Sequence, residues 1–187
     1  MRLLLLISVF FTLTVNNLSA QKNNEEISLF NAVIDVYGNT ISGIMAIKQE
    51  SDDKFRILFT TVAGPKLLDM YITKDNYEVI YAVKKLNKKI ILKLFQKDFA
   101  LVTGLYFDKS YFDMPKEEYR IPLNKKDTAI YHAGMTGEYF NINKAEYKGK
   151  KKILFDAVYE YDKYTIEKIV LQHYNFKMTI TLNRFNQ

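Results

Sequence analysis

Apolar and polar residues alternate through much of the first half of the chain, and this alternation predicts short antiparallel strands. A tight turn is expected at Gly38-Asn39, between the first strand and the second. The five predicted strands are residues 28–37, residues 41–50, two strands within residues 53–70, and residues 77–84. Because short turns join them, these strands form an antiparallel meander.

The period changes from two to three or four after Asn87. Asn87 is the expected N-cap of an amphipathic helix, and Gly104 is its expected C-terminal stop. We expect the apolar stripe of this helix to lie on the concave face of the sheet. The apolar positions at helical spacing are Ile90, Ile91, Leu94, Phe95, Leu101 and Val102.

Residues 105–127 show no clear period and contain Pro115 and Pro122, so we interpret them as an irregular connector. Alternation then returns and predicts four more strands. These are residues 138–143, 151–160, 165–174 and 176–185. The predicted fold class is therefore mainly β with α, a curved antiparallel sheet capped by one amphipathic helix.

Two of the predicted strands are apolar on both faces. Ile57, Leu58 and Phe59 are consecutive, and residues 44–47 repeat the feature. A sheet with one face in water is expected to alternate apolar and polar residues, so it does not require strands that are apolar on both faces. They indicate a curved sheet around helices or around an apolar cavity, although burial under a helix also explains any single residue.

The turn between the third and fourth strands is also apolar. Val62 and Ala63 precede Gly64-Pro65, where a hairpin turn would ordinarily present polar residues to water. Two apolar residues in such a turn are therefore a candidate functional feature.

The N-terminus has the plan of a secretory signal peptide. Arg2 precedes an apolar run from Leu3 to about Val15, and Ala20 stands at the expected cleavage position. A membrane anchor is the alternative, but a spanning helix needs roughly 20 apolar residues. We therefore expect residues 1–20 to be a signal peptide and residues 21–187 to be a single exported domain.

Composition narrows the class of protein. The 187 residues are 48% hydrophobic, which suits one domain with a proper core. The chain has no Cys, so we expect no disulfide, no thiolate metal site and no lipid modification of the mature N-terminus. Loss of Arg2 with the signal peptide lowers the formal charge from +6 to +5.

The modest positive charge is spread over many lysines. Lys148, Lys150, Lys151 and Lys152 are expected in an exposed turn around Gly149. A solvated surface explains them, and weak attraction to anionic lipid headgroups is the alternative. No nucleic-acid-binding module is recognisable, so we expect no nucleic-acid partner. We also expect the protein to be a monomer.

No catalytic constellation is visible. His132 and His173 stand in no metal-binding or nucleophile signature, and His173 is expected in a strand or at the surface. Asp156, Glu160 and Asp162 are expected on a solvated strand face. We therefore expect neither an enzyme nor a cofactor nor a metal. A secreted hydrolase would need one of the histidines to meet a carboxylate or hydroxyl in space.

The stretch "DKFRILFTTVAGPKLLDM", residues 53–70, resembles LolB of the LolA/LolB family of bacterial outer-membrane lipoprotein-sorting proteins. The shared pattern is Asp-x-aromatic-Arg, aliphatic residues, Thr, a short apolar turn closed by Gly, and an apolar strand. "IILKLFQ" and "IVLQHYNFKMTITLNRF" are weaker echoes. The resemblance implies an unclosed half-barrel whose interior receives lipoprotein acyl chains without catalysis.

The same resemblance implies site residues. Val62 and Ala63 would contact membrane or cargo, and Arg56 would match the motif arginine, either holding the cavity closed or pairing at the surface. The residues expected to line a lipid cavity are Met45, Ile47, Ile57, Phe59, Met70, Ile72, Ile91, Leu94, Phe95, Met178 and Ile180. Each buried CH2 of an acyl chain contributes roughly 0.8 kcal/mol, so such a cavity can hold lipid.

This chain departs from LolB at two points. Ala63 stands where the receptor has a larger leucine, and the Cys that makes the receptor a lipoprotein is absent. The expected function is thus a periplasmic, carrier-like protein that binds lipid or lipoprotein acyl chains. The alternative is a cell-envelope protein-interaction domain with a filled core and no lipid.

Overall fold

The computed structural model describes residues 27–107 and 116–185. The expected signal peptide, residues 1–20, lies outside the described residues. Within the described part, one helix and eleven strands form: β1 (Ile27–Val36), β2 (Asn39–Ser51), β3 (Lys54–Thr60), β4 (Lys66–Ile72), β5 (Tyr77–Ala82), α1 (Lys89–Val102), β6 (Glu118–Pro122), β7 (Thr128–Thr136), β8 (Tyr139–Lys148), β9 (Ile153–Asp162), β10 (Thr165–His173) and β11 (Met178–Arg184).

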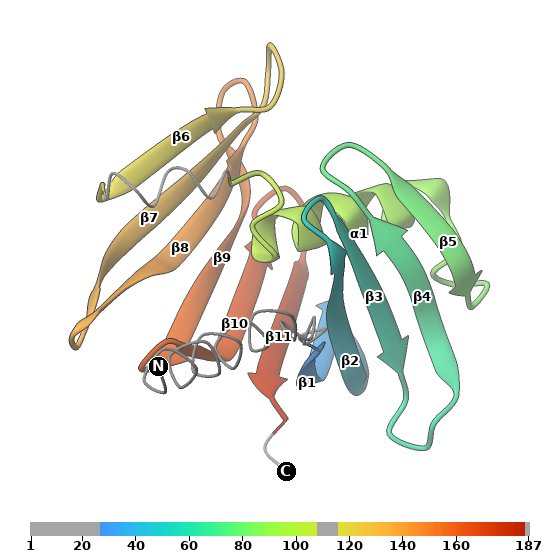
Figure 1. Cartoon of the computed structure of the whole chain (residues 1–187). Helices are drawn as coiled ribbons and strands as arrows, with labels where there is room; N and C mark the ends of the chain where they lie inside the picture. The colour runs from blue at the N-terminus through green and yellow to red at the C-terminus, as the bar shows by residue number, and fades with distance from the viewer. Residues whose placement is uncertain (1–26, 108–115, 186–187) are drawn as a thin grey trace, which may run out of the picture.

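All eleven strands belong to one antiparallel sheet, in the order β5-β4-β3-β2-β1-β11-β10-β9-β8-β7-β6. The first and last strands pair in the middle, and β5 and β6 are the two edges. The sheet curves around α1, which follows one edge strand in the chain and precedes the other (Figure 1). The predicted fold class, an unclosed half-barrel with a helix, is confirmed.

The hairpin between β1 and β2 turns at Tyr37-Gly38, one residue earlier than expected. Val36 pairs with Asn39, and both turn residues have positive φ angles, 54° and 80°. Two successive residues with positive φ make the type I′ turn, whose twist matches that of the flanking strands.

The connector prediction for residues 105–127 was wrong at residues 118–122, because β6 forms there, and β6 and β7 together complete one side of the sheet. β6 alternates, with Tyr119 and Ile121 buried, and Pro122 is tolerated because β6 is an edge strand. β7 was not predicted, since Ala129, Ile130 and Tyr131 are buried in succession and give no alternation. β8 is also longer than the predicted strand at residues 138–143.

The helix begins at Lys89, one residue later than the Asn87 cap implied. Lys88 is the N-cap and makes no side-chain capping bond. Ile90 is 79% exposed, whereas Gln96 and Asp98 are buried. The simple apolar stripe failed because the curved sheet encloses the C-terminal half of α1 from more than one side, and groups on the strands and their turns contact the polar side chains.

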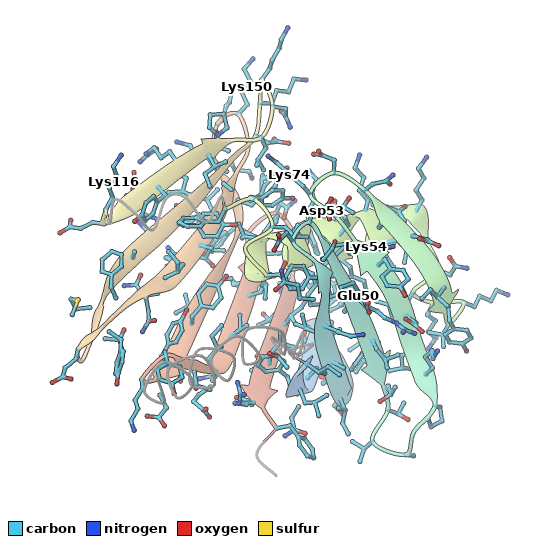
Figure 2. All side chains as sticks on the ribbon, in the orientation of Figure 1. Glu50, Asp53, Lys54, Lys74, Lys116 and Lys150 are labelled. Carbon is cyan, nitrogen blue, oxygen red and sulfur yellow. The ribbon has the colours of Figure 1, made fainter. Side chains whose placement is uncertain are left out.

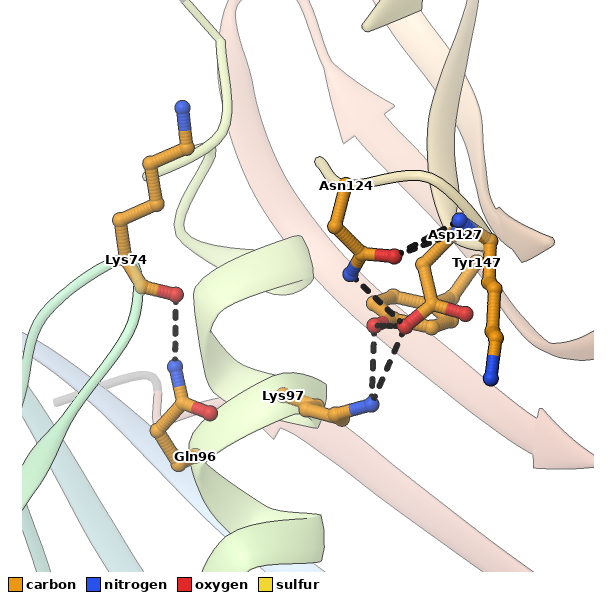
Figure 3. A network of polar contacts seen from close by, with 7 residues as sticks. Lys74, Gln96, Lys97, Asn124, Asp127 and Tyr147 are labelled. Carbon is orange, nitrogen blue, oxygen red and sulfur yellow. Dashed lines mark hydrogen bonds and ion pairs between the residues drawn. The ribbon is translucent and has the colours of Figure 1, made fainter. Parts of the chain in front are cut away.

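Polar contacts attach α1 to the turns beside both edges of the sheet (Figure 3). On one side, Gln96 donates to the carbonyls of Thr73 and Lys74, at 2.8 and 2.9 Å, in the turn after β4. On the other side, Lys97 donates to the Tyr147 hydroxyl at 2.9 Å. Lys97 also lies 3.7 Å from Asp127, in the turn after β6.

Asp127 is the centre of the second attachment. Partial burial raises the pKa of its carboxyl, but hydrogen bonds from Asn124, Tyr147 and Lys97 outweigh burial and hold the pKa below its usual value. The carboxylate is therefore charged at neutral pH, and it fixes the middle of α1 against β8.

Most of the lysine-rich turn lies where it was expected. Lys150, Lys151 and Lys152 are exposed, and Gly149 N–H closes the turn on Lys152 O at 2.9 Å, but Lys148 is the half-buried last residue of β8. Figure 2 shows Lys150 in the protruding turn between β8 and β9. Within the described residues, no helix has the length and apolar character needed to span a membrane.

Candidate functional site

A cavity of about 510 Å³ opens on the concave side of the sheet, beside the C-terminal end of α1. Its volume falls within the range of roughly 300–1,000 Å³ that is usual for small-molecule sites. Most of the lining is aromatic or aliphatic. The residues that line it are Gln49, Asp52, Phe55, Val102, Thr103, Gly104, Leu105, Phe107, Tyr131, Ile142, Tyr159, Tyr161 and Ile166.

The roof of the cavity is the turn that ends α1. Gly104 has a φ of +72°, its N–H donates to Leu101 O at 3.2 Å, and the Leu105 N–H donates to Ala100 O at 3.0 Å. These bonds make a Schellman motif, in which glycine at the left-handed position stops the helix. The predicted stop at Gly104 is confirmed, and the same residue shapes the cavity.

Tyrosines from the opposite side of the cavity contact this roof. The hydroxyls of Tyr131 on β7 and Tyr159 on β9 each lie 3.4 Å from Leu101 O, at the last turn of α1. Tyr161 donates to Ile142 O at 2.8 Å, which joins the ends of β8 and β9 along the cavity wall. Along this wall, the three tyrosines thus contribute apolar rings and hydroxyl groups that are already hydrogen-bonded.

These tyrosines remain neutral at physiological pH. Burial raises the pKa of Tyr161 to about 12, and burial raises the pKa of Tyr131 and Tyr159 well above the usual value. The cavity is therefore suited to an apolar ligand body, because its wall carries no tyrosinate charge.

The eleven residues predicted for a lipid cavity lie elsewhere, in the packed interior between α1 and the sheet. Ile91 and Leu94 are half-buried. The other nine are buried: Met45, Ile47, Ile57, Phe59, Met70, Ile72, Phe95, Met178 and Ile180. None of the eleven lines the 510 Å³ cavity.

The cavity residues that sequence reasoning missed come mainly from the second half of the sheet. Tyr131 lies in β7, which was not predicted at all, and Ile142 lies at the start of β8. Tyr159 and Tyr161 alternate on one face of β9, so a search for aromatic residues at period two would have found them.

The apolar turn protrudes as the sequence suggested. Val62 is 77% exposed and Ala63 is also exposed, while the Gly64 N–H closes the turn on Thr61 O at 3.0 Å. Phe55, in the cavity wall, lies near the other end of the same strand. The turn and the cavity are therefore separated by most of the length of β3, roughly 20 Å.

Arg56 lies on the face of β3 opposite the buried Ile57 and Phe59. Its Nε and Nη2 each donate to the Asp69 carboxylate at 3.0 Å, and Lys66 Nζ adds a bond at 2.8 Å. The hydrogen bond from Arg56 is the main cause that lowers the pKa of Asp69. Arg56 thus joins β3 to β4 on the outer face and is not among the residues that line the cavity.

The two histidines lie on opposite faces. His173 was expected in a strand or at the surface, and it lies in strand β10, with its side chain fully buried beside Asp98 of α1. His132 is partly exposed on the outer face, 3.7 Å from Glu118 and 3.5 Å from Glu146. The described residues contain no group of three His, Asp or Glu that could hold a metal ion.

The prediction of a solvated strand face was wrong for Asp156 and holds for Glu160. Asp156 is buried, and it lies 3.1 Å from Lys144 Nζ and accepts a hydrogen bond from the Tyr174 hydroxyl at 2.9 Å. Glu160 conforms to the prediction, since it is exposed and pairs with Lys168 at 2.7 Å. These pairs are structural cross-links between neighbouring strands.

A second hollow, of about 660 Å³, lies where the β1–β2 and β10–β11 turns meet. Turn residues such as Asp35, Asn175 and Lys177 line it. Because a small-molecule site is usually an apolar concavity with few polar groups, the cavity beside α1 is the better candidate.

Comparison of the sequence with protein-family models found no match, and comparison with curated proteins found no significant match. Solved structures include similar ones. A LolA superfamily protein from Nitrosomonas europaea shares 9% identity over 87% of this chain and 86% of that chain, with a TM-score of 0.44.

Two further structures have TM-scores of 0.38. A domain assigned to outer membrane lipoprotein sorting, from Vibrio parahaemolyticus, is 11% identical over 86% of this chain and 83% of its own. A DUF1329 family protein from Desulfovibrio piger is 9% identical over 88% and 85%.

Proposed function

We propose that this protein binds the acyl chains of lipids or lipoproteins in the cavity beside α1, without catalysis, as a carrier of the bacterial periplasm. The observation that carries the proposal is the cavity itself, about 510 Å³ and lined mainly by aromatic and aliphatic side chains. Transfer of methylene groups from water into such a site is favourable by roughly 0.8 kcal/mol each. A role in outer-membrane lipoprotein transport or insertion follows from the LolB-like stretch at residues 53–70.

The exposed turn has a part in this proposal. Val62 and Ala63 would touch the membrane or the cargo when lipid is delivered, while the acyl chains lie at the other end of β3. Lysines in other turns would add weak attraction to anionic headgroups. The turn would therefore contribute to lipid delivery and the cavity to lipid binding, and the two contributions can be tested separately.

Binding can be tested directly with the purified protein. Titration with N-phenyl-1-naphthylamine, an uncharged apolar dye, should give saturable fluorescence, and protein from the native host should release lipid on extraction. Ile166→Trp would fill part of the cavity and should weaken dye binding about tenfold. Val158→Trp, at a half-exposed position on the outer face of β9, is the matched control and should leave it unchanged.

Protein that is reproducibly empty and takes up no dye would overturn the proposal. Equal dye affinities in Ile166→Trp and Val158→Trp would place the binding outside this cavity.

A filled-core protein-interaction domain is the second candidate. The observation in its favour is that Met45, Ile57, Phe59 and Met70 have no exposed surface at all. A photo-crosslinker at Val62 separates the candidates, because capture of protein without lipid would favour the interaction domain.

A further inference from the structure

The segment between β5 and the first turn of α1 is strongly basic. No acidic residue occurs between Glu78 and Asp98, whereas several lysines do. Four of these lysines lie close together in the chain and are exposed, and none of the four forms an ion pair with another described residue. The four are Lys84, Lys85, Lys88 and Lys89, and residues 83–90 are called the basic segment below.

The start of α1 does not neutralise this charge. The helix has no acidic residue in its first turn, and its N-cap, Lys88, makes no side-chain capping bond. Because the N-terminus is the positive end of the helix macrodipole, Lys88 and Lys89 stand where acidic residues would be favoured. An anionic partner would offset this unfavourable arrangement of charge.

Apolar side chains are exposed among these lysines. Ile90 is 79% exposed in the first turn of α1, and Tyr81 is 45% exposed near the end of the edge strand β5. Lysines beside exposed apolar side chains are typical of surfaces that lie on anionic membranes. The lysines attract the headgroups, and the apolar side chains enter the boundary between headgroups and acyl chains.

The basic segment lies beside the apolar turn that contains Val62. The Val83 N–H donates to Leu67 O at 3.0 Å, and Leu67 is the second residue of β4, which follows that turn. Since strand residues advance by about 3.3 Å, Val62 and Val83 are roughly 15–20 Å apart. The apolar turn and the basic segment therefore lie at the same end of β3, β4 and β5.

We propose that this end of the molecule, the basic segment together with Val62 and Ala63, is the face that lies on an anionic lipid bilayer. The inference rests on the proposed function and deepens it, because it assigns the membrane contact to one face and specifies the charge of the lipid. A bilayer is favoured over an acidic protein surface because Val62 and Ile90, 77% and 79% exposed, can both enter lipid.

The test is cosedimentation with vesicles of two compositions, phosphatidylcholine alone and an equimolar mixture of phosphatidylcholine and phosphatidylglycerol. The native protein should bind the mixed vesicles about tenfold more strongly. A triple variant with Lys84→Gln, Lys85→Gln and Lys88→Gln should lose about tenfold in affinity for the mixed vesicles, because each lysine near an anionic surface contributes to binding.

The turn between β8 and β9 supplies the matched control (Figure 2). Lys150→Gln, Lys151→Gln and Lys152→Gln remove the same charge from exposed positions in the other half of the sheet. This second triple variant should keep most of the native affinity for the mixed vesicles. None of the substituted lysines lines the cavity, so both triple variants should take up N-phenyl-1-naphthylamine like the native protein.

The apolar part of the contact is measured at high salt. In about 1 M salt the Debye length is about 3 Å, so attraction between lysines and headgroups is largely screened. Ile90→Ser should then weaken the remaining binding to the mixed vesicles about threefold. Met135→Ser, at a position that is 65% exposed in β7, is the control and should leave that binding unchanged.

Equal losses in the two triple variants would overturn the inference, as would equal binding of the native protein to the two vesicle compositions. Equal binding of Ile90→Ser and Met135→Ser would also overturn it, because attraction to an acidic protein surface would need the lysines alone. Vesicle binding as described without any uptake of dye would instead overturn the proposed binding of acyl chains in the cavity. The two failures are therefore distinguishable.

Discussion

The Asp98 carboxylate on α1 lies 3.2 Å from Nε2 of His173, the last residue of β10, and both side chains are fully buried. The rings of Phe155 and Phe176 lie 4.9 and 4.5 Å from the imidazole. Burial raises the pKa of the Asp98 carboxyl, because the charged form loses its water. The pair ties the helix to the centre of the sheet.

Removal of one partner should be more costly than replacement of both. Asp98→Ala or His173→Ala leaves a buried polar group unpaired and should lower the free energy of unfolding by about 3–5 kcal/mol. The double variant Asp98→Leu with His173→Leu should lose clearly less than the sum of the single changes. Urea unfolding in a double-mutant cycle measures the difference.

The exposed pair Glu160 and Lys168, at 2.7 Å, is the control for this cycle. Its coupling should not exceed about 1 kcal/mol, because water screens both charges. Similar coupling energies in the two cycles would contradict a special role for the buried pair.

Stability should also depend on pH with opposite signs at two aspartates. The folded pKa of Asp69 is lowered, first by the hydrogen bond from Arg56, so its stabilisation is present above the unfolded pKa of about 3.8 and is lost as pH falls through the folded pKa. The folded pKa of Asp98 is raised, so its contribution is present below about 3.8 and is lost as pH rises through the folded pKa.

Urea unfolding measured from pH 2 to pH 7 checks both signs. Asp69→Asn should cost about 2–4 kcal/mol at pH 7 and should flatten the acid side of the curve. Asp98→Asn should instead remove a fall in stability with rising pH. Arg56→Lys keeps the charge but loses the two-pronged contact, and it should lie between the native protein and Asp69→Asn. A steeper acid limb in Asp69→Asn would contradict the assignment.

The first half of the fold was predictable because its strands carry their information locally. Alternation and short turns placed β1 to β5 within a few residues, and the apolar pair Val62-Ala63 proved to be exposed. The second half depends on contacts between distant segments. β6 is a five-residue edge strand, and it becomes a strand only by pairing with β7, through contacts such as Tyr119 with Tyr131.

The candidate site was less predictable for the same reason. A residue such as Ile57 is apolar whether it fills a core or lines a cavity, and only the distance to α1 decides between them. Tyr131 and Tyr159 come from strands that are not adjacent, and they converge only because the sheet curves around the end of the helix. Likewise, Asp98 and His173 are 75 residues apart, so nothing local could reveal the pair.

The apolar turn offers a test of delivery that leaves folding intact. Val62→Asp places a charge on a side chain that is 77% exposed, so the free energy of unfolding should change by no more than about 0.5 kcal/mol. If the turn contacts membrane, association with lipid vesicles should fall. Cosedimentation with anionic and with neutral vesicles measures the effect and separates it from the contribution of the lysines.

Tyr164→Asp is the control for this prediction. Tyr164 is 73% exposed in the turn between β9 and β10, so it matches Val62 in exposure and in change of charge. Equal losses of vesicle binding in both variants would indicate a general effect of charge and would remove the special role of the Val62 turn.

The position of that turn depends on Gly43 in β2. A Cβ atom at Gly43 would stand 1.9 Å from the backbone oxygen of Thr60, the last residue of β3, and 3.0 Å from the Phe59 ring. Backbone cannot move aside as a flexible side chain can, so Gly43→Ala should separate the strands here and lower the free energy of unfolding by about 2–4 kcal/mol.

Gly38→Ala is the matched comparison. Gly38 has open space around its Cβ position but a φ of +80°, so alanine there should cost only about 1 kcal/mol of backbone strain. Urea unfolding ranks the two variants, and hydrogen exchange locates the change. Amides of β3 near Thr60 should lose protection in Gly43→Ala and keep it in Gly38→Ala. Equal costs would mean that the close approach of β2 to β3 does not hold the Val62 turn in place.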